Sequence, residues 1–127
     1  MMKNLEKDVL EYLKERGWDN LRPSDLAKSI SIEAAELLEI FQWSSISIEE
    51  TKQDANRIEK IKRELADILI YVLDMSVLLD LDTEKIIREK LEYVKKKFPA
   101  ELMKKDGQEE NKHYIEIKEK YRRDGLS

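Results

Sequence analysis

Two pairs of carboxylates occur among apolar residues, each pair spaced by one helical turn. Glu33 and Glu36 lie in the stretch "SIEAAELLEIFQW", and Glu64 and Asp67 open the stretch "ELADILIYVLDMSVLLDL". Residues three apart share one face of a helix, so each pair points in one direction. An unpaired charge is costly to bury, and a buried carboxyl tends to take up a proton instead. Acids at these positions therefore need a physical reason.

A shared metal ion would provide that reason. If the two helices pack antiparallel, the four carboxylates converge, and their mutual repulsion forces some of them to bind protons unless a divalent cation is present. The ligand set consists only of oxygen atoms, which favours Mg²⁺ or Mn²⁺ over zinc or copper. The structural alternative is that the acids form salt bridges with Lys or Arg on neighbouring helices.

Other metal sites are excluded by residue type. The chain contains no cysteine, so disulfides and thiolate ligands are impossible. A di-iron carboxylate bundle needs a Glu-x-x-His pattern on two helices, and the single histidine, His113, lies far from both acid pairs in the sequence. Glu39 and Asp74 continue the two acidic series. Glu39 either acts at the site or faces water, and Asp74 either faces water or accepts a hydrogen bond beside the metal ligands.

Apolar periodicity predicts an all-α fold built from four helices and a tail. The expected helices span 3–16, Ser24 or Asp25 to 43, 57–79, and Asp82 or Thr83 to 98, with a polar loop at 44–56. The tail segment "ENKHYIEIKEKY" fits a helix or an alternating strand equally well. We therefore expect an all-α domain at 1–99 and a C-terminal tail of undefined structure at 100–127.

Composition restricts the class of protein. The 127 residues suit one domain with a modest core, and three Gly and two Pro provide few of the turns that β folds require. A net charge of −4 gives no general attraction to nucleic acid, so RNA binding through Lys95–Lys97 is poorly supported. Neither a charged leader before an apolar segment nor an uncharged spanning segment is visible, so we expect a cytoplasmic protein without membrane contact.

Taken in order, these motifs resemble the MazG-like, all-α nucleoside triphosphate pyrophosphohydrolases, and within them the single-domain branch that includes dCTP pyrophosphatase. The resemblance covers about residues 15–99 and rests on "EAAE", "FQW", "ELADILIYVL" and "KLEYVKKKFP". It implies a four-helix bundle and Mg²⁺-dependent cleavage of the bond between the α- and β-phosphates of a nucleoside triphosphate, which yields a monophosphate and pyrophosphate. It also implies that the metal ligands are Glu33, Glu36, Glu64 and Asp67.

The resemblance further implies a substrate-binding set. Trp18 and Trp43 would hold the base, while Tyr71 and Lys90 would reach the phosphates or the sugar. Glu36 is the candidate catalytic base, with Glu39 as the alternative. On residue type alone, each tryptophan could instead be an apolar side chain that packs at the end of a helix. Lys90 could instead be a basic residue whose charge complements the dipole at the C-terminal end of its helix.

Three positions depart from the family pattern. Ile32 stands before Glu33 where many members have a second acid. Val94 and Arg22 replace an expected Asn and His. The metal site tolerates these changes, but the preference for base and sugar does not follow from the resemblance.

The helix expected at 57–79 is apolar over most of its circumference, which predicts an oligomer. The following side chains cannot all be covered within one subunit of this length: Ile68, Leu69, Val72, Leu73 and Val77. We therefore expect a homodimer or homotetramer. The competing hypothesis is a helical interaction module without enzymatic activity, or a degenerate relative that serves as an assembly subunit.

Overall fold

The structure is a computed structural model that describes residues 1–106 and 111–127. Every regular element in these ranges is a helix, so the predicted all-α class is confirmed. The chain divides into two compact units, residues 1–83 and 84–127. The helices are α1 (Met2–Glu15), α2 (Pro23–Glu39), α3 (Ile48–Gln53), α4 (Ala55–Leu78), α5 (Thr83–Lys97), α6 (Ala100–Lys104) and α8 (Lys112–Arg123).

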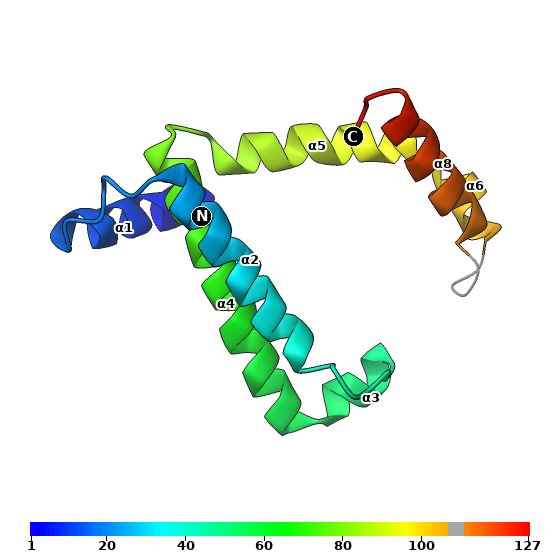
Figure 1. The fold of residues 1–127 in the computed structure, drawn as a ribbon, viewed down its shortest axis with the longest axis horizontal. Coiled ribbons are helices and arrows are strands. Elements are labelled where there is room, and N and C mark those ends of the chain that lie inside the picture. Colours follow the sequence, from blue (N-terminus) through cyan, green and yellow to red (C-terminus); the bar gives the residue numbers. More distant parts are fainter. Residues whose placement is uncertain (107–110) are drawn as a thin grey trace. The chain divides into compact units, whose positions relative to one another are not determined.

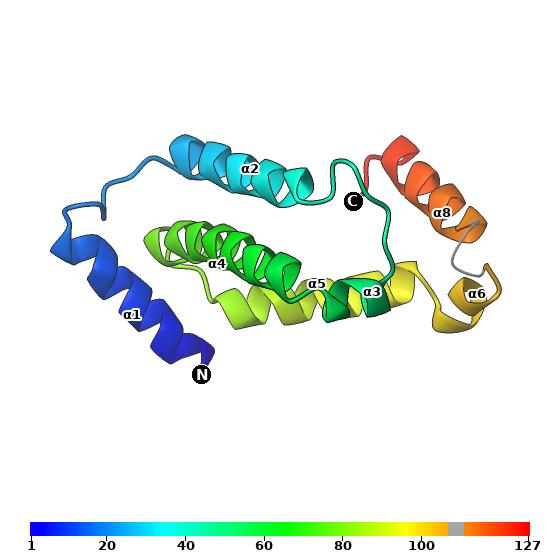
Figure 2. The same ribbon diagram turned by 90° about the horizontal axis from the view of Figure 1, so that it is seen from below.

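The first unit is organised around α2 and α4, which lie side by side and run antiparallel (Figures 1 and 2). Leu26, near the start of α2, lines the same cavity as Asp74, near the end of α4. Ile40, just after α2, lines a second cavity with Arg57, in the first turn of α4. This arrangement sets the face of α2 that carries "EAAE" opposite the face of α4 that carries "ELAD".

Helix α1 packs on the C-terminal half of α4 through a small apolar core. Val9 and Leu13 of α1 are buried against Leu73 of α4. The helix ends at Glu15 with Arg16 as its C-cap, and Gly17 follows with a φ of +68°, which is accessible to glycine at little cost. The N–H of Gly17 donates to the Lys14 carbonyl at 3.1 Å, and the N–H of Trp18 donates to the Leu13 carbonyl at 2.8 Å. This pair of bonds forms a Schellman motif, which turns the chain sharply and places Trp18 directly beyond the end of α1.

The observed bounds of α2 differ from the prediction at both ends. The helix begins at Pro23 with Arg22 at the N-cap, and no side chain caps it, so the predicted cap at Ser24 or Asp25 is wrong. Proline suits the first helical position because its missing N–H would have no partner there. The helix ends at Glu39 rather than at Trp43. Phe41 N–H bonds to the Leu38 carbonyl at 3.0 Å, an i to i−3 bond that tightens the chain into turns.

The segment predicted as a loop at 44–56 contains the short helix α3. Ser47 caps it: its Oγ accepts a hydrogen bond from the Glu50 N–H at 3.1 Å and donates to Glu50 Oε1 at 3.2 Å. This variant of the capping box was visible in the sequence as "SIEE". Asp54 then caps α4 by accepting a hydrogen bond from the Arg57 N–H at 3.0 Å. The chain therefore reverses direction between α2 and α4 through a short helix, and a side-chain cap fixes the start of both α3 and α4.

The described residues of the second unit contain α5 from Glu84 onward, α6 and α8. The tail segment that fitted a helix or a strand is helical over Lys112–Arg123. Asp106 accepts hydrogen bonds from the N–H groups of His113 at 2.8 Å and Tyr114 at 3.3 Å, and its carboxylate also contacts the His113 ring. These bonds satisfy donors in the first turn of α8 that have no partner within the helix. The predicted domains, 1–99 and 100–127, remain a prediction.

Within the described ranges, no helix combines the length and the apolar character needed to cross a bilayer.

Candidate metal and nucleotide site

Three of the predicted acids meet between α2 and α4. Glu33, Glu64 and Asp67 each offer a carboxylate oxygen, and these oxygens all lie within 4.8 Å of one another. Glu33 and Glu64 are half-buried, while Asp67 is exposed. The antiparallel packing of the two helices, together with the i, i+3 spacing on α4, accounts for the cluster.

The pKa values reflect this crowding. Hydrogen bonding to the Glu36 carboxyl, burial, and repulsion by Glu36 together raise the pKa of Glu33 to about 7. Burial, followed by hydrogen bonding to Glu36, raises the pKa of Glu64. Glu36 is therefore the fourth member of the cluster, since its carboxyl acts on both neighbours. Without a cation, the cluster reduces its repulsion by holding protons.

The buried oxygens of the cluster lack partners. Glu33 Oε2 and Glu64 Oε2 are buried and accept no hydrogen bond from the described residues. None of Glu33, Glu36, Glu64 and Asp67 forms an ion pair with a Lys or Arg of the described ranges. The salt-bridge alternative is therefore wrong for the described part of the chain. Unpartnered carboxylate oxygens a few ångströms apart fit a hard divalent cation.

On one side of the cluster, α1, α2 and α4 enclose a cavity of about 410 Å³, here called the aromatic cavity. Glu33 and Asp67 belong both to the acid cluster and to the wall of this cavity. Trp18 and Tyr12 meet edge to face, with ring centroids 5.9 Å apart. The lining residues are Tyr12, Leu13, Trp18, Leu21, Asp25, Leu26, Ser29, Glu33, Asp67, Ile70, Tyr71 and Asp74. Two aromatic walls beside the acid cluster suit a flat ring attached to a charged group.

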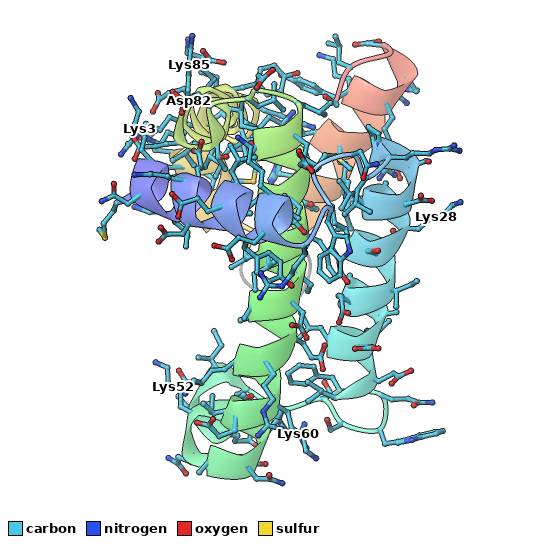
Figure 3. The ribbon with its side chains drawn as sticks, turned by 90° about the vertical axis from the view of Figure 1, so that its left-hand side faces the viewer. Lys3, Lys28, Lys52, Lys60, Asp82 and Lys85 are labelled. Atoms are coloured by element: carbon cyan, nitrogen blue, oxygen red, sulfur yellow. The ribbon has the colours of Figure 1, made fainter. Side chains whose placement is uncertain are left out.

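On the other side, a second cavity of about 500 Å³ extends from Glu36 and Glu64 toward the start of α4. We call it the basic cavity after Arg57, Lys60 and Arg63, which line it together with Glu36, Glu39, Ile40, Asp54, Asn56 and Glu64. Lys60 projects from the part of α4 that lies beside the end of α2, whereas Lys28 points away from α4 (Figure 3).

Arg57 is held in place within this wall. Its Nη1 donates to Ser44 Oγ at 2.7 Å, and its Nε lies 3.4 Å from Asp54 Oδ2. Sequence reasoning missed the three cations. The spacing in "RIEKIKRE" could have identified them, because Arg57, Lys60 and Arg63 recur every three positions and so share one face of the helix directly before Glu64.

The remaining predicted residues lie in different places. Tyr71 is half-buried in the wall of the aromatic cavity, and Glu39 lines the basic cavity with an exposed side chain. Trp43 is 90% exposed and lines neither cavity, so the structure does not bring it together with Trp18 within one chain. Lys90 belongs to the second unit, where its Nζ donates to Ser127 Oγ at 3.3 Å.

A family model described as the MazG-like family matches residues 28–118. The chain belongs to the MazG-like family. The matched segment contains both acid pairs but begins after Trp18, so the first wall of the aromatic cavity lies outside it.

Solved and curated relatives of this MazG-like protein agree with that assignment. A pyrophosphatase from Archaeoglobus fulgidus is 38% identical, with a TM-score of 0.68 over 77% of this chain and 92% of its own. The proteins named dCTP pyrophosphatase 1 from Rattus norvegicus and Homo sapiens are each 28% identical over 95 residues, which is 72% of this chain. The match covers 55% of those proteins, so the chain spans about half the length of the curated relatives it matches.

Proposed function

We propose that this MazG-like protein hydrolyses a nucleoside triphosphate between the α- and β-phosphates, using Mg²⁺, with Mn²⁺ as a possible substitute. The observation that carries the proposal is the position of the acid cluster between two different cavities. One cavity is lined by aromatic side chains, and the other by three basic residues among acids; each is lined by two acids of the cluster, counting Glu36. A nucleoside triphosphate matches this arrangement, because it has a flat base at one end and a polyanion at the other.

The acid cluster is where the reaction would occur. Glu33, Glu64 and Asp67 would hold the metal, since their oxygens are close together and one oxygen each of Glu33 and Glu64 lacks a partner. Glu36, whose carboxyl raises the pKa of both Glu33 and Glu64, would be the fourth ligand. A bound magnesium ion would neutralise phosphate charge and lower the pKa of a coordinated water molecule. The water oxygen bonds to the α-phosphorus, the bond from that phosphorus to the bridging oxygen breaks, and pyrophosphate leaves with the electron pair. The water proton passes to a carboxylate, for which we propose Glu36.

The aromatic cavity would hold the nucleoside. Trp18 offers a ring for base stacking, which contributes about 1–3 kcal/mol per base in proteins that bind single-stranded nucleic acid. Tyr71 lies one helical turn beyond Asp67 on α4, so it reaches the sugar or the α-phosphate from the same wall. The relatives named dCTP pyrophosphatase suggest a deoxycytidine nucleotide as the first substrate to test.

The basic cavity would hold the leaving pyrophosphate. Lys60 and Arg63 form no ion pair with another described residue, so their charges are available to phosphate oxygens. Arg57 is already fixed by Ser44 and Asp54 and presents its guanidinium in a defined orientation. Cations aimed at oxygens that gain charge as the bond breaks would favour the transition state. We propose Lys90, from the second unit, as a further phosphate-binding residue because of the family resemblance alone.

We also propose that the protein is a homodimer or homotetramer. Leu69 is 58% exposed and Leu65 is 44% exposed on α4, while Ile32 is 58% exposed and Leu38 is 71% exposed on α2. Apolar side chains this exposed on two adjacent helices favour burial against another copy of the chain. Trp43, at 90% exposed, would also gain burial in such an assembly.

The test is an incubation of purified protein with a panel of ribo- and deoxynucleoside triphosphates and Mg²⁺. We expect equal amounts of monophosphate and pyrophosphate from at least one of them, and no release of single phosphate. EDTA should abolish the reaction. Release of inorganic phosphate alone would mean cleavage at another bond, and the absence of any product would favour the interaction module.

A further inference from the structure

Asp74 is the most deeply buried acid of the first unit, and the catalytic proposal does not use it. The residue is 3% exposed, and its Oδ1 is buried and accepts no hydrogen bond from the described residues. Among these residues, no Lys or Arg forms an ion pair with it. An acceptor left unsatisfied inside a protein is destabilising, so a partner of suitable chemistry would bind there favourably.

The position of Asp74 identifies that partner. Asp67, Tyr71 and Asp74 are spaced i, i+4, i+7 on α4 and line the same wall of the aromatic cavity. Seven residues advance a helix by about 10 Å, which is close to the length of a nucleoside. With the α-phosphate at the acid cluster, the far edge of the base would therefore reach the level of Asp74.

We propose that the Asp74 carboxylate accepts a hydrogen bond from an amino group of the nucleotide base, so that the aromatic cavity selects amino-bearing bases over their keto counterparts. This inference rests on the proposed function, because it assigns the aromatic cavity to the nucleoside. Burial raises the pKa of Asp74 to about 6, so the group is ionised above that pH and acts as an acceptor only.

The amino group distinguishes cytosine from uracil at this position. Cytosine presents an N–H donor at position 4, whereas uracil presents a carbonyl oxygen that a carboxylate repels. The ring N–H of uracil is flanked by two carbonyl oxygens, so a carboxylate that approaches it meets repulsion on both sides. Sites built to bond one polar group reject the analogue that lacks it, because their own buried group is then left unpaired.

The sugar is the other source of a donor, since a ribose or deoxyribose hydroxyl can also bond to a carboxylate. The two sources respond differently to changes in the ligand. Loss of the 3′-hydroxyl would remove a sugar contact and leave a base contact intact, whereas exchange of amino for keto would do the opposite.

The experiment measures binding as well as turnover at pH 8. α,β-Imido analogues of dCTP, dUTP and 2′,3′-dideoxy-CTP, whose α–β bond is not cleaved, are titrated with Mg²⁺ by calorimetry into wild-type, Asp74→Asn and Glu6→Gln proteins. Glu6 is the matched control because its Oε1 is also buried without a hydrogen bond from the described residues, yet it lines a different cavity. Hydrolysis of dCTP and dUTP is followed in parallel.

We expect the wild type and Glu6→Gln to bind the dCTP analogue about 10- to 150-fold more tightly than the dUTP analogue, the range for hydrogen bonds to charged groups. In Asp74→Asn the ratio should fall close to one, since an amide can donate to the keto group as well as accept from the amino group. The dideoxy analogue should respond to Asp74→Asn as the deoxy analogue does.

Three results would overturn the proposal. They are equal binding of the two analogues by the wild type, an unchanged ratio in Asp74→Asn, and an Asp74→Asn effect that disappears with the dideoxy analogue. If Asp74→Asn does not fold, as judged by circular dichroism, the wild-type ratio decides alone. If no triphosphate is hydrolysed, the proposed function fails, and the binding ratio still decides the role of Asp74.

Discussion

Replacing Asp74 by Asn should change how the stability of the metal-free protein depends on pH. Burial raises the pKa of Asp74 from 3.8 to about 6 in the folded state. An acid with a higher pKa when folded binds more protons in the folded state than in the unfolded state. Its contribution to stability is therefore complete below pH 3.8 and is lost as the pH rises through 6.

The magnitude follows from the two pKa values. Complete ionisation of Asp74 would cost the folded state at most about 3 kcal/mol. Between pH 5 and pH 8 the same two values correspond to a loss of about 1.4 kcal/mol in the free energy of unfolding. Asparagine does not titrate, so Asp74→Asn should gain about 1.4 kcal/mol relative to the wild type between these two pH values.

Urea unfolding in EDTA gives the measurement. Tryptophan fluorescence reports on the first unit, because Trp18 and Trp43 are the two tryptophans of the chain and both belong to it. Any cost of burying the amide itself is independent of pH and cancels in the comparison, as do acids present in both proteins. Asp25→Asn, at the exposed rim of the same cavity, controls for loss of a charge there. Parallel stability curves for wild type and Asp74→Asn would refute the reasoning.

Four further outcomes are expected. Glu64→Gln should abolish pyrophosphate release, retain the helical circular dichroism spectrum and raise the melting temperature of the metal-free protein at pH 8, because one crowded charge is removed; loss of helicity or full activity would contradict the metal assignment. Trp18→Ala should raise KM by about 5- to 150-fold through lost stacking, without changing metal affinity measured by calorimetry. Lys60→Ala should raise KM for the triphosphate roughly tenfold, whereas Lys62→Ala, whose Nζ pairs with Glu59 at 3.0 Å, should not. Sedimentation at micromolar concentration should show a dimer or tetramer, and an active monomer would exclude the oligomer.

The sequence by itself determined the helices and the faces that carry the acids, since these features depend on local spacing. A repeat of 3.6 residues per turn assigns Glu33 and Glu36 to one face and Glu64 and Asp67 to another, whatever the rest of the chain does. The same logic would have identified α3, because the capping-box pattern from Ser47 to Glu50 is local. The all-α class and the MazG-like family follow from such patterns.

The tertiary structure alone decided what surrounds the acids. Helical spacing does not show which faces meet, so the antiparallel contact of α2 and α4, and with it the convergence of three carboxylates within 4.8 Å, comes from packing. The tertiary structure also gives the two tryptophans different environments. The Schellman motif at Gly17 turns Trp18 into the wall of the aromatic cavity, whereas Trp43 is 90% exposed. The burial of Asp74 could not be read from its helix, because depth depends on α1 crossing α4 at that level. Contacts between residues distant in the chain define depth and cavity walls, and no local period encodes them.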